Sequence, residues 1–468
     1  MQEESQVTDD KDTNLSLSSE IDKEFADSTF VAKPISKKSV VKINKRLAYI
    51  IAATHYVGFL TPIWVIFGTD KLGLSLVLSL VLGTTGWVTS SLFEVPMGAV
   101  ADKYGRKMSL ISGLALCAIG DLSLIAFNNF AVLIAFQVVA GFGFALRSGS
   151  LEGLLHDSFE AVGESTEYSK LSSKMLFLVN ASRVFTVPIG AWLYTLSIDS
   201  SPSSYTYPYM ASVASFVIAV LCATFLVEMH TVEVLKEKIA NENLIKIIVR
   251  IWKQMSETFY EMMADRDVKR VIVLLGLYAF IGEGNWALYQ YYFRERDIGL
   301  TESGWVYTVL VLLMAIGSLF VTKVYKKINV MWALNLIIAL VSFNIILMHL
   351  PLGFAAIGFL VNAFVGPMAL YLHDNAIQNR MKGDKKTTAL SIASMTYNIG
   401  AMLGVYGIGA VAQSIGVLNA QWYLVGYGAI VFVVMGAWCY KDGFAVRAED
   451  AHATGLDVSF DETSQLKP

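Results

Sequence analysis

Charged residues are scarce in this chain of 468 residues. Asp, Glu, Lys and Arg make up only 16% of it, whereas soluble domains carry about a quarter. Hydrophobic residues make up 55%, and the mean hydropathy is +0.53. This composition argues against a soluble globular protein and indicates a chain that folds in a lipid bilayer.

Cysteine is also rare, and several motifs are missing. The three cysteines, Cys117, Cys222 and Cys439, lie far apart inside apolar runs, which argues against a disulfide framework or a cysteine metal site. The sequence contains no P-loop, so direct coupling to ATP is not expected. No polar element repeats as it would in a channel filter. The sequence predicts neither a cofactor nor a metal.

Two His-Asp pairs, His156-Asp157 and His373-Asp374, are the residues that a membrane-embedded enzyme would offer. Both pairs fall at the same end of corresponding apolar runs. Duplicated helix ends explain them better than hydrolytic or metal chemistry does, and we expect no enzyme.

Apolar runs of about 20 residues, long enough to cross a bilayer core of about 30 Å, occur about twelve times. Only helices or closed barrels satisfy the backbone in lipid, and these runs are too long for barrel strands. The sequence therefore predicts an all-α integral membrane protein with twelve transmembrane helices in two six-helix bundles. The runs lie near 47–67, 75–100, 108–128, 131–156, 171–196, 206–227, 269–292, 302–322, 329–349, 353–379, 386–413 and 420–440.

Lys and Arg are distributed unevenly between the connections, which predicts the orientation. One set of connections is rich in them, whereas the other holds only Lys71, Arg294 and Arg296. Because cytoplasmic loops carry the excess of positive charge, both termini are expected in the cytoplasm and the chain in the cell membrane. The rich connections hold Lys103, Arg106 and Lys107, then Lys236 to Arg270, then Lys323, Lys326 and Lys327, and finally Arg380, Lys382, Lys385 and Lys386.

A polar segment separates the sixth run from the seventh. Within it, Leu244, Ile247, Ile248, Ile251 and Trp252 recur at helical spacing, which predicts an amphipathic helix on the inner leaflet. The N-terminal residues lack the apolar core of a signal peptide and read as a polar tail. The predicted divisions are a tail over 1–46, bundles over 47–228 and 268–441, a linker over 229–267 and a second tail over 442–468.

The two halves share an internal similarity. The segments 141–158 and 358–375 both start with Gly-Phe, carry a Gly eight residues on and contain Leu-His-Asp near the end. Each segment belongs to the fourth run of its half. This placement favours a parallel duplication.

The connection between the second and third runs carries a motif, G-A-V-A-D-K-Y-G-R-K over residues 98–107. It resembles the loop between helices 2 and 3 of the major facilitator superfamily, whose members have twelve helices in two halves. The resemblance implies a cytoplasmic latch between the halves. Its residues here are Gly98, Asp102, Lys103, Gly105, Arg106 and Lys107.

The chemistry of this loop fits either a latch or a simple anchor. Gly98 and Gly105 allow close helix contact and a tight reversal, and Arg106 and Lys107 place positive charge at the inner headgroups. The alternative is a positive-inside anchor without a latch. The matching loop of the second half has no acid at the position of Asp102, so any latch is one-sided.

Ionisable residues inside spans are costly, and they are expected to face the bundle interior or a wet cavity. In the resembling family, the first, fourth, seventh and tenth helices line the central cavity, which favours His55, Arg147, Glu152 and Glu283 over Asp121. Neighbouring Tyr56 and the polar and aromatic residues of runs 7 and 10 complete the predicted cavity wall. These are Trp286, Tyr289, Gln290, Asn362 and Tyr371.

Glu283 is the first candidate for carrying a proton, because a carboxyl in an apolar, intermittently wet pocket suits that task. Arg183 and Glu283 each lie about 13 residues, or roughly 20 Å, from the cytoplasmic start of their helices, so an ion pair between the halves is one alternative. Asp121 is a further candidate for proton coupling. Arg147 is expected either to bind an anionic group or to serve structure alone.

A secondary transporter working by alternating access explains these features together. The expected partners are a small-molecule substrate, protons and lipid, with no nucleic acid, and the expected state is a monomer. Proton-coupled efflux is the first prediction and proton-coupled nutrient uptake the alternative. A broad apolar cavity would favour efflux, whereas several convergent hydrogen-bonding groups would favour uptake.

Overall fold

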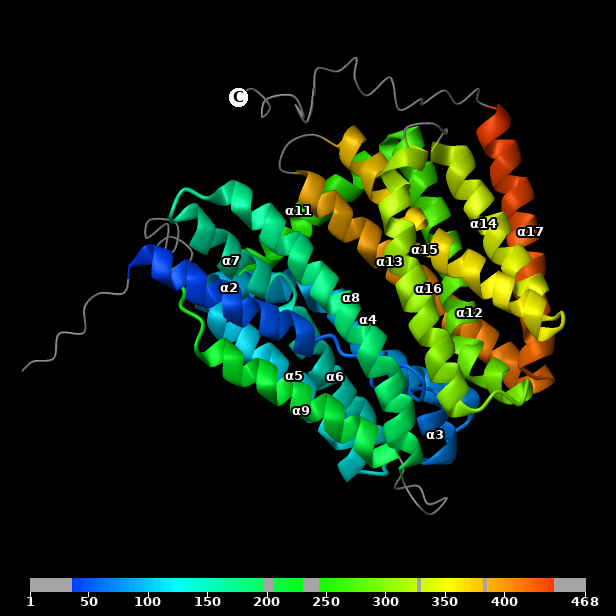
Figure 1. Cartoon of the computed structure of the whole chain (residues 1–468). Helices are drawn as coiled ribbons and strands as arrows, with labels where there is room; N and C mark the ends of the chain where they lie inside the picture. Colours follow the sequence, from blue (N-terminus) through cyan, green and yellow to red (C-terminus); the bar gives the residue numbers. More distant parts are fainter. Residues whose placement is uncertain (1–35, 197–204, 230–243, 326–329, 382–384, 442–468) are drawn as a thin grey trace, which may run out of the picture.

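The computed structural model describes residues 36–196, 205–229, 244–325, 330–381 and 385–441, and every regular element in these ranges is a helix (Figure 1). Residues 1–35 of the first predicted tail and the whole of the second lie outside the described residues, whereas residues 37–46 form the start of the first described helix. The helices are α2 (Lys37–Thr54), α3 (Ile66–Asp70), α4 (Leu76–Tyr104), α5 (Arg106–Ala126), α6 (Phe130–Arg147), α7 (Ser150–Glu160), α8 (Ser165–Thr195), α9 (Thr206–Thr224), α11 (Leu244–Ala264), α12 (Arg266–Glu295), α13 (Leu300–Tyr325), α14 (Val330–Met348), α15 (Leu352–Arg380), α16 (Lys385–Ile415) and α17 (Val417–Lys441).

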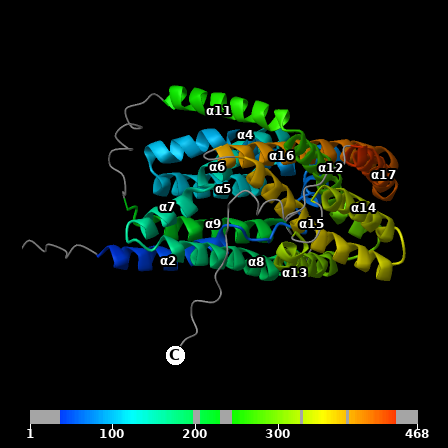
Figure 2. The same cartoon turned by 90° about the horizontal axis from the view of Figure 1, so that it is seen from above.

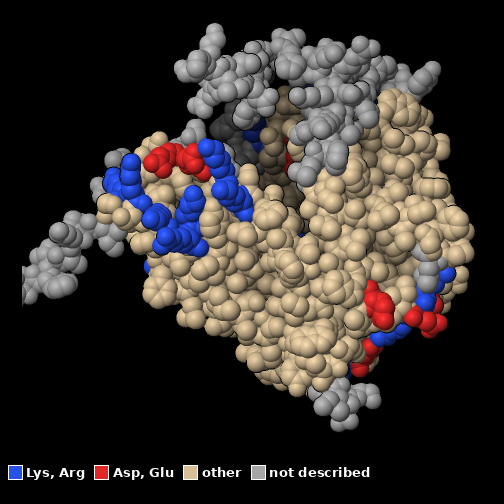
Figure 3. Space-filling model, in the orientation of Figure 1, with Lys and Arg blue, Asp and Glu red and all other residues tan. Residues whose placement is uncertain are grey.

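The helices form two groups, α2 to α9 and α12 to α17, which meet near α3 and diverge toward the opposite end (Figure 1). We call the two ends the α3 side and the α11 side. The groups touch through α4 against α16 and through α8 against α13. Charged side chains gather at the two ends of the visible face and leave a broad uncharged band, with a hollow at the α11 side (Figure 3).

Eleven of the described helices are long and apolar enough to cross a membrane, one fewer than predicted. The exception is the first run, which divides into α2 and the short α3. Residues 55–65 between them contain Gly58 and Pro62, and Pro62 has no N–H to continue a helix. The backbone N–H of Gly58 instead donates to Oγ1 of Thr186 at 2.8 Å. Irregular backbone at membrane depth is tolerated where it is packed in protein or lines a cavity.

The fourth run is also interrupted, between α6 and α7. Gly149 at the break has φ +69°, a conformation that glycine adopts without strain. Its counterpart in the sequence repeat, Gly366, lies inside the continuous helix α15. The two similar segments therefore fold differently at this point.

Helix α11 lies where the sequence predicts an amphipathic helix, and residues 230–243 of the linker lie outside the described residues. Ile247, Met255 and Met262 are buried, whereas Trp252 and Tyr260 on other faces are exposed. Figure 2 shows α11 along one edge of the molecule, and it contacts α4, α12 and α16. The helix thus bridges the two groups.

Close helix packing in the first group requires glycine at position 143. A Cβ built at Gly143 would lie 2.7 Å from the Gly113 carbonyl oxygen and 2.8 Å from Cβ of Leu116. We expect Gly143→Ala to lower the unfolding free energy by about 1–3 kcal/mol through overpacking, measured as an earlier thermal transition in detergent. Gly426→Ala is the matched control, because no atom lies within 4 Å of its Cβ position. Equal stability of the two variants would contradict this packing.

Candidate functional site

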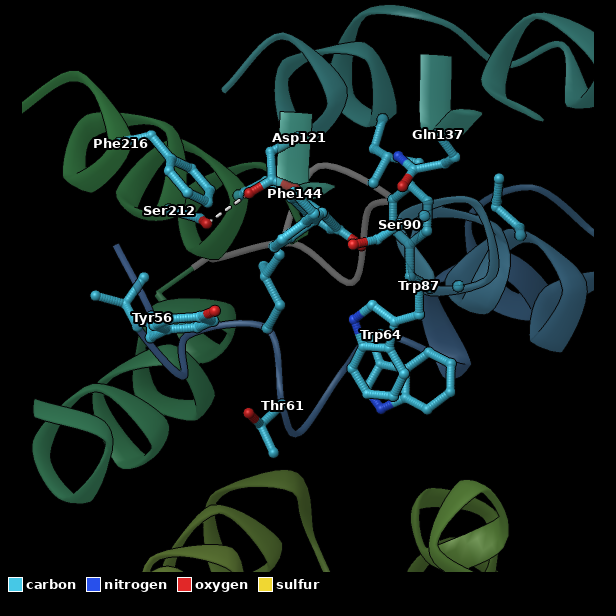
Figure 4. Close-up of a pocket in the computed structure, with 18 of the residues that line it drawn as sticks. Tyr56, Thr61, Trp64, Trp87, Ser90, Asp121, Gln137, Phe144, Ser212 and Phe216 are labelled. Atoms are coloured by element: carbon cyan, nitrogen blue, oxygen red, sulfur yellow. Dashed lines mark hydrogen bonds between the residues drawn. The ribbon is translucent and has the colours of Figure 1, made fainter. Parts of the chain in front are cut away.

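A cavity of about 500 Å³ lies mainly within the first group of helices (Figure 4). This volume is typical of pockets for small organic ligands. Only Trp286 of α12 and Asn398 of α16 come from the second group. The other lining residues include His55, Tyr56, Thr61, Trp64, Trp87, Ser90, Ser91, Asp121, Gln137, Phe144, Arg183 and Ser212.

Polar groups converge on this cavity from several helices. Asp121 of α5 accepts a hydrogen bond of 2.6 Å from the hydroxyl of Ser212 on α9 (Figure 4). Arg183 of α8 is exposed into the space, and it takes part in none of the ion pairs among the described residues. The helices predicted as the second, third, fifth and sixth spans thus supply polar groups that the family pattern did not favour.

The break between α2 and α3 forms one wall of the cavity. His55 ends α2, and its ring lies 4.4 Å from that of Tyr56, centroid to centroid. Trp64 follows Pro62 and lies beside Trp87 of α4, with ring centroids 6.5 Å apart (Figure 4). The tryptophans were missed in the sequence, although the Gly and Pro that interrupt the first run mark the place.

Arg147 does not line the cavity. The residue is 4% exposed, and its guanidinium carbon lies 4.1 Å from the ring centroid of Tyr56 and 4.5 Å from that of Phe144. Nη1 donates to the His55 carbonyl at 3.3 Å, while Nε and Nη2 have no hydrogen-bond partner among the described residues. Arg147 therefore links the end of α6 to the end of α2, behind the residues that line the cavity.

Glu152 does not lie in the cavity wall, where the sequence predicts it. It lies exposed in the first turn of α7 and lines neither of the two described cavities. Helix α7 packs against α2, α5 and α8. The two His-Asp pairs also differ, since His156 is exposed and His373 is buried.

Glu283 lines a second, smaller cavity of about 40 Å³. The hydroxyl of Tyr397 on α16 donates a hydrogen bond to its carboxyl group. Trp64, Trp87 and Trp286 line both cavities and so form a partition between Glu283 and the larger space. No ion pair joins Glu283 to Arg183 in the described part of the chain, and the two residues line different cavities.

The predicted wall from runs 7 and 10 is mostly a packed core. Tyr289 is fully buried, and its hydroxyl accepts a hydrogen bond of 3.0 Å from Asn362. Neither residue lines a described cavity, and neither does Tyr371. Only Trp286 among these predicted residues does. The rotation of each helix about its axis decides this, and the sequence does not reveal it.

Gln290 closes the α3 side between the two groups. Its Oε1 accepts hydrogen bonds from the backbone N–H groups of Val65 (2.9 Å) and Ile66 (3.1 Å). Its Nε2 donates to the Thr61 carbonyl at 2.8 Å. A residue predicted for the cavity wall is thus a buried bridge between α12 and the broken first run.

An ion pair reinforces the same closure at the surface. Arg294 donates two hydrogen bonds to Asp70, of 3.0 and 2.5 Å, and the Tyr291 hydroxyl donates to Oγ1 of Thr69 at 2.7 Å. Burial alone would raise the pKa of Asp70, but the hydrogen bonds and charge of Arg294 outweigh it and hold the pKa below its ordinary value of 3.8. The pair therefore persists at neutral pH and is lost only as pH falls through that lowered pKa.

The glycine-rich motif makes all its described contacts within the first group. Gly105 has φ +103° at the reversal between α4 and α5, whereas the space around Gly98 is open. Arg106 lies 3.5 Å from Asp102 and 3.3 Å from Asp157. Close helix contact at Gly98 was therefore a wrong prediction, and the tight reversal at Gly105 is confirmed. Lys103 lies over the ring of Tyr104, and Lys107 follows in the first turn of α5.

The family model described as Major Facilitator Superfamily matches residues 47–384. Among curated proteins, the chain is 20% identical over 390 residues to an uncharacterized MFS-type transporter of Methanocaldococcus jannaschii, covering 82% of this chain and 93% of that protein. It is 25% identical over 179 residues to an uncharacterized transporter of Rickettsia bellii, covering 37% and 39%.

Solved structures share the fold at low sequence identity. A nucleoside transporter has a TM-score of 0.63 and 13% identity, covering 85% of this chain and 98% of its own. A POT family transporter in complex with a thioalcohol-conjugated peptide has a TM-score of 0.64 and 11% identity, with coverages of 86% and 96%. A D-xylose-proton symporter has a TM-score of 0.57 and 12% identity, with coverages of 85% and 96%. These similarities show a shared fold.

Proposed function

Because this chain belongs to the Major Facilitator Superfamily and is thus a membrane-embedded transporter, we propose that it takes up a small organic molecule together with protons. The observation that carries this proposal is the lining of the main cavity. Hydrogen-bonding groups from different helices, including Thr61, Ser90, Asp121, Gln137 and Arg183, converge on one space. Such a site supports uptake over the export that the sequence alone favoured.

The closed α3 side and the hollow at the α11 side support an alternating-access cycle. This arrangement is then one state of that cycle. In this proposal the chain lies in the cell membrane, and the excess of Lys and Arg in the connections at the α11 side supports a cytoplasmic location for that side and for both termini. The state is then open inward. Movement of the two groups about the central cavity would break the contacts of Gln290 and Arg294 and open the α3 side.

The motif loop serves as the latch of the opposite state in this proposal. Asp102 has a side chain 56% exposed and faces only Arg106 in the described contacts, so it is free to meet the second group when the α11 side closes. Glu283 serves as the proton carrier, close to the substrate space but behind the tryptophan partition. One chain holds both groups of helices and both cavities, so a monomer in lipid is sufficient.

The experiment is a flux assay on purified protein in liposomes. A thermal-shift screen of metabolites first supplies a ligand, and its uptake is then measured with and without an inward proton gradient. We expect the gradient to accelerate uptake at least about tenfold and substrate entry to alkalinise the outside medium. Substrate that leaves the liposomes while protons enter would show export. An absence of any pH effect would contradict proton coupling.

A further inference from the structure

One cation of the main cavity, Arg183, has no ion pair among the described residues. Asp121 is the acidic residue of the lining, and its carboxyl group accepts a hydrogen bond from Ser212 instead of from Arg183. Because an unpaired charge at membrane depth is costly, this arrangement favours a ligand that brings a negative group.

A second guanidinium adds positive charge behind the cavity wall. Arg147 lies directly behind Tyr56 and Phe144, two residues of the cavity wall, and it is 96% buried without a carboxylate partner in the described residues. Within the described part of the chain, its Nε and Nη2 atoms lack hydrogen-bond partners. Two guanidinium groups therefore act on a space that contains one carboxylate.

Another part of the cavity lining is aromatic. Trp64, Trp87 and Trp286 all line it, and Trp87 is 56% exposed even though it lies in the middle of α4. Indole faces bind flat apolar groups by stacking and do not require a particular hydrogen-bond pattern. The cavity thus presents a cation and an aromatic surface within about 500 Å³.

We propose that this cavity binds organic anions with an aromatic body, in which a carboxylate pairs with Arg183 and the ring packs against Trp87. The planar guanidinium matches a carboxylate with two parallel hydrogen bonds. The volume admits one such ligand with a few waters. Because the same tryptophans border the Glu283 cavity, the ring of a bound ligand would contact side chains that also line the proposed proton site. This inference rests on the transport function proposed above.

The test compares three probes by calorimetry on the detergent-purified full chain: 3-phenylpropionate, its neutral amide 3-phenylpropionamide, and butyrate. We expect the arylcarboxylate to bind at least about tenfold more tightly than either of the others. Arg183→Gln should remove the preference for the carboxylate over the amide, and Arg183→Lys should restore part of it. Trp87→Leu should remove only the preference for the aryl acid over butyrate.

Lys246→Gln, which removes one positive charge from the exposed surface of α11, is the matched control and should leave all three affinities unchanged. Equal binding of acid and amide, binding of no probe at millimolar concentration, or tighter binding of zwitterionic phenylalanine than of 3-phenylpropionate would overturn the proposal. Unaltered thermal transitions of the variants exclude misfolding as the cause. Binding of the acid without pH-driven flux would contradict the proposed transport function but not the proposed ligand class. Flux of other compounds without binding of the acid would contradict the ligand class but not the transport function.

Discussion

Replacing Glu283 with Gln is expected to abolish the acceleration of uptake by a proton gradient. Glu283 is a carboxyl inside a small cavity, hydrogen-bonded by Tyr397 and without an ion pair among the described residues. Gln keeps the size and the hydrogen bond from Tyr397 but cannot exchange a proton. Gradient-driven uptake in liposomes should fall at least about tenfold, while exchange of labelled for unlabelled substrate at equal pH continues.

Glu257→Gln on the exposed surface of α11 is the matched control for the loss of one carboxyl group. Asp121→Asn tests the other carboxyl near the cavities. A Glu283→Gln protein that keeps its full response to the gradient would exclude Glu283 as the carrier. If Asp121→Asn then lost the response, the proton site would lie in the first group of helices.

Replacing Gln290 with Leu is expected to open the α3 side. The variant loses three hydrogen bonds between the groups and leaves the buried N–H groups of Val65 and Ile66 without their acceptor. Unsatisfied buried groups cost about 1–3 kcal/mol each in this closed state, and water satisfies them once the side opens. The equilibrium should shift toward the α3-open state at least about tenfold, or about 1.4 kcal/mol.

A cysteine at position 61 reports this shift. The three native cysteines are first replaced by Ala, and Thr61→Cys is then labelled with a membrane-impermeant thiol reagent supplied only at the α3 side. We expect labelling to accelerate in the Gln290→Leu background and to stay slow with Gln254→Leu, a glutamine on α11 whose bond joins a different pair of helices. Unchanged labelling in the Gln290 variant would contradict a role of Gln290 in holding this side closed.

The sequence of one helix at a time predicts only part of the candidate site. Buried charges in apolar runs identified Asp121, Arg183 and Glu283, and all three line described cavities because charge at membrane depth needs a polar or wet environment. Arg147 and Glu152 share the same kind of position in the sequence and line neither. Their placement follows from the break between α6 and α7 and from the rings that cover the guanidinium.

The sequence by itself determined that this chain crosses a membrane as a helical bundle, because only long apolar helices satisfy their backbone without water. It also located the tight reversal at Gly105 and the amphipathic α11. Tertiary structure alone decided which faces of the helices meet. Contacts between α12 and the broken first run made Gln290 a bridge instead of a cavity residue, and the approach of α4 to that break placed Trp64 and Trp87 beside the site. Such outcomes depend on helix rotation and on distant partners, which no local pattern of residues specifies.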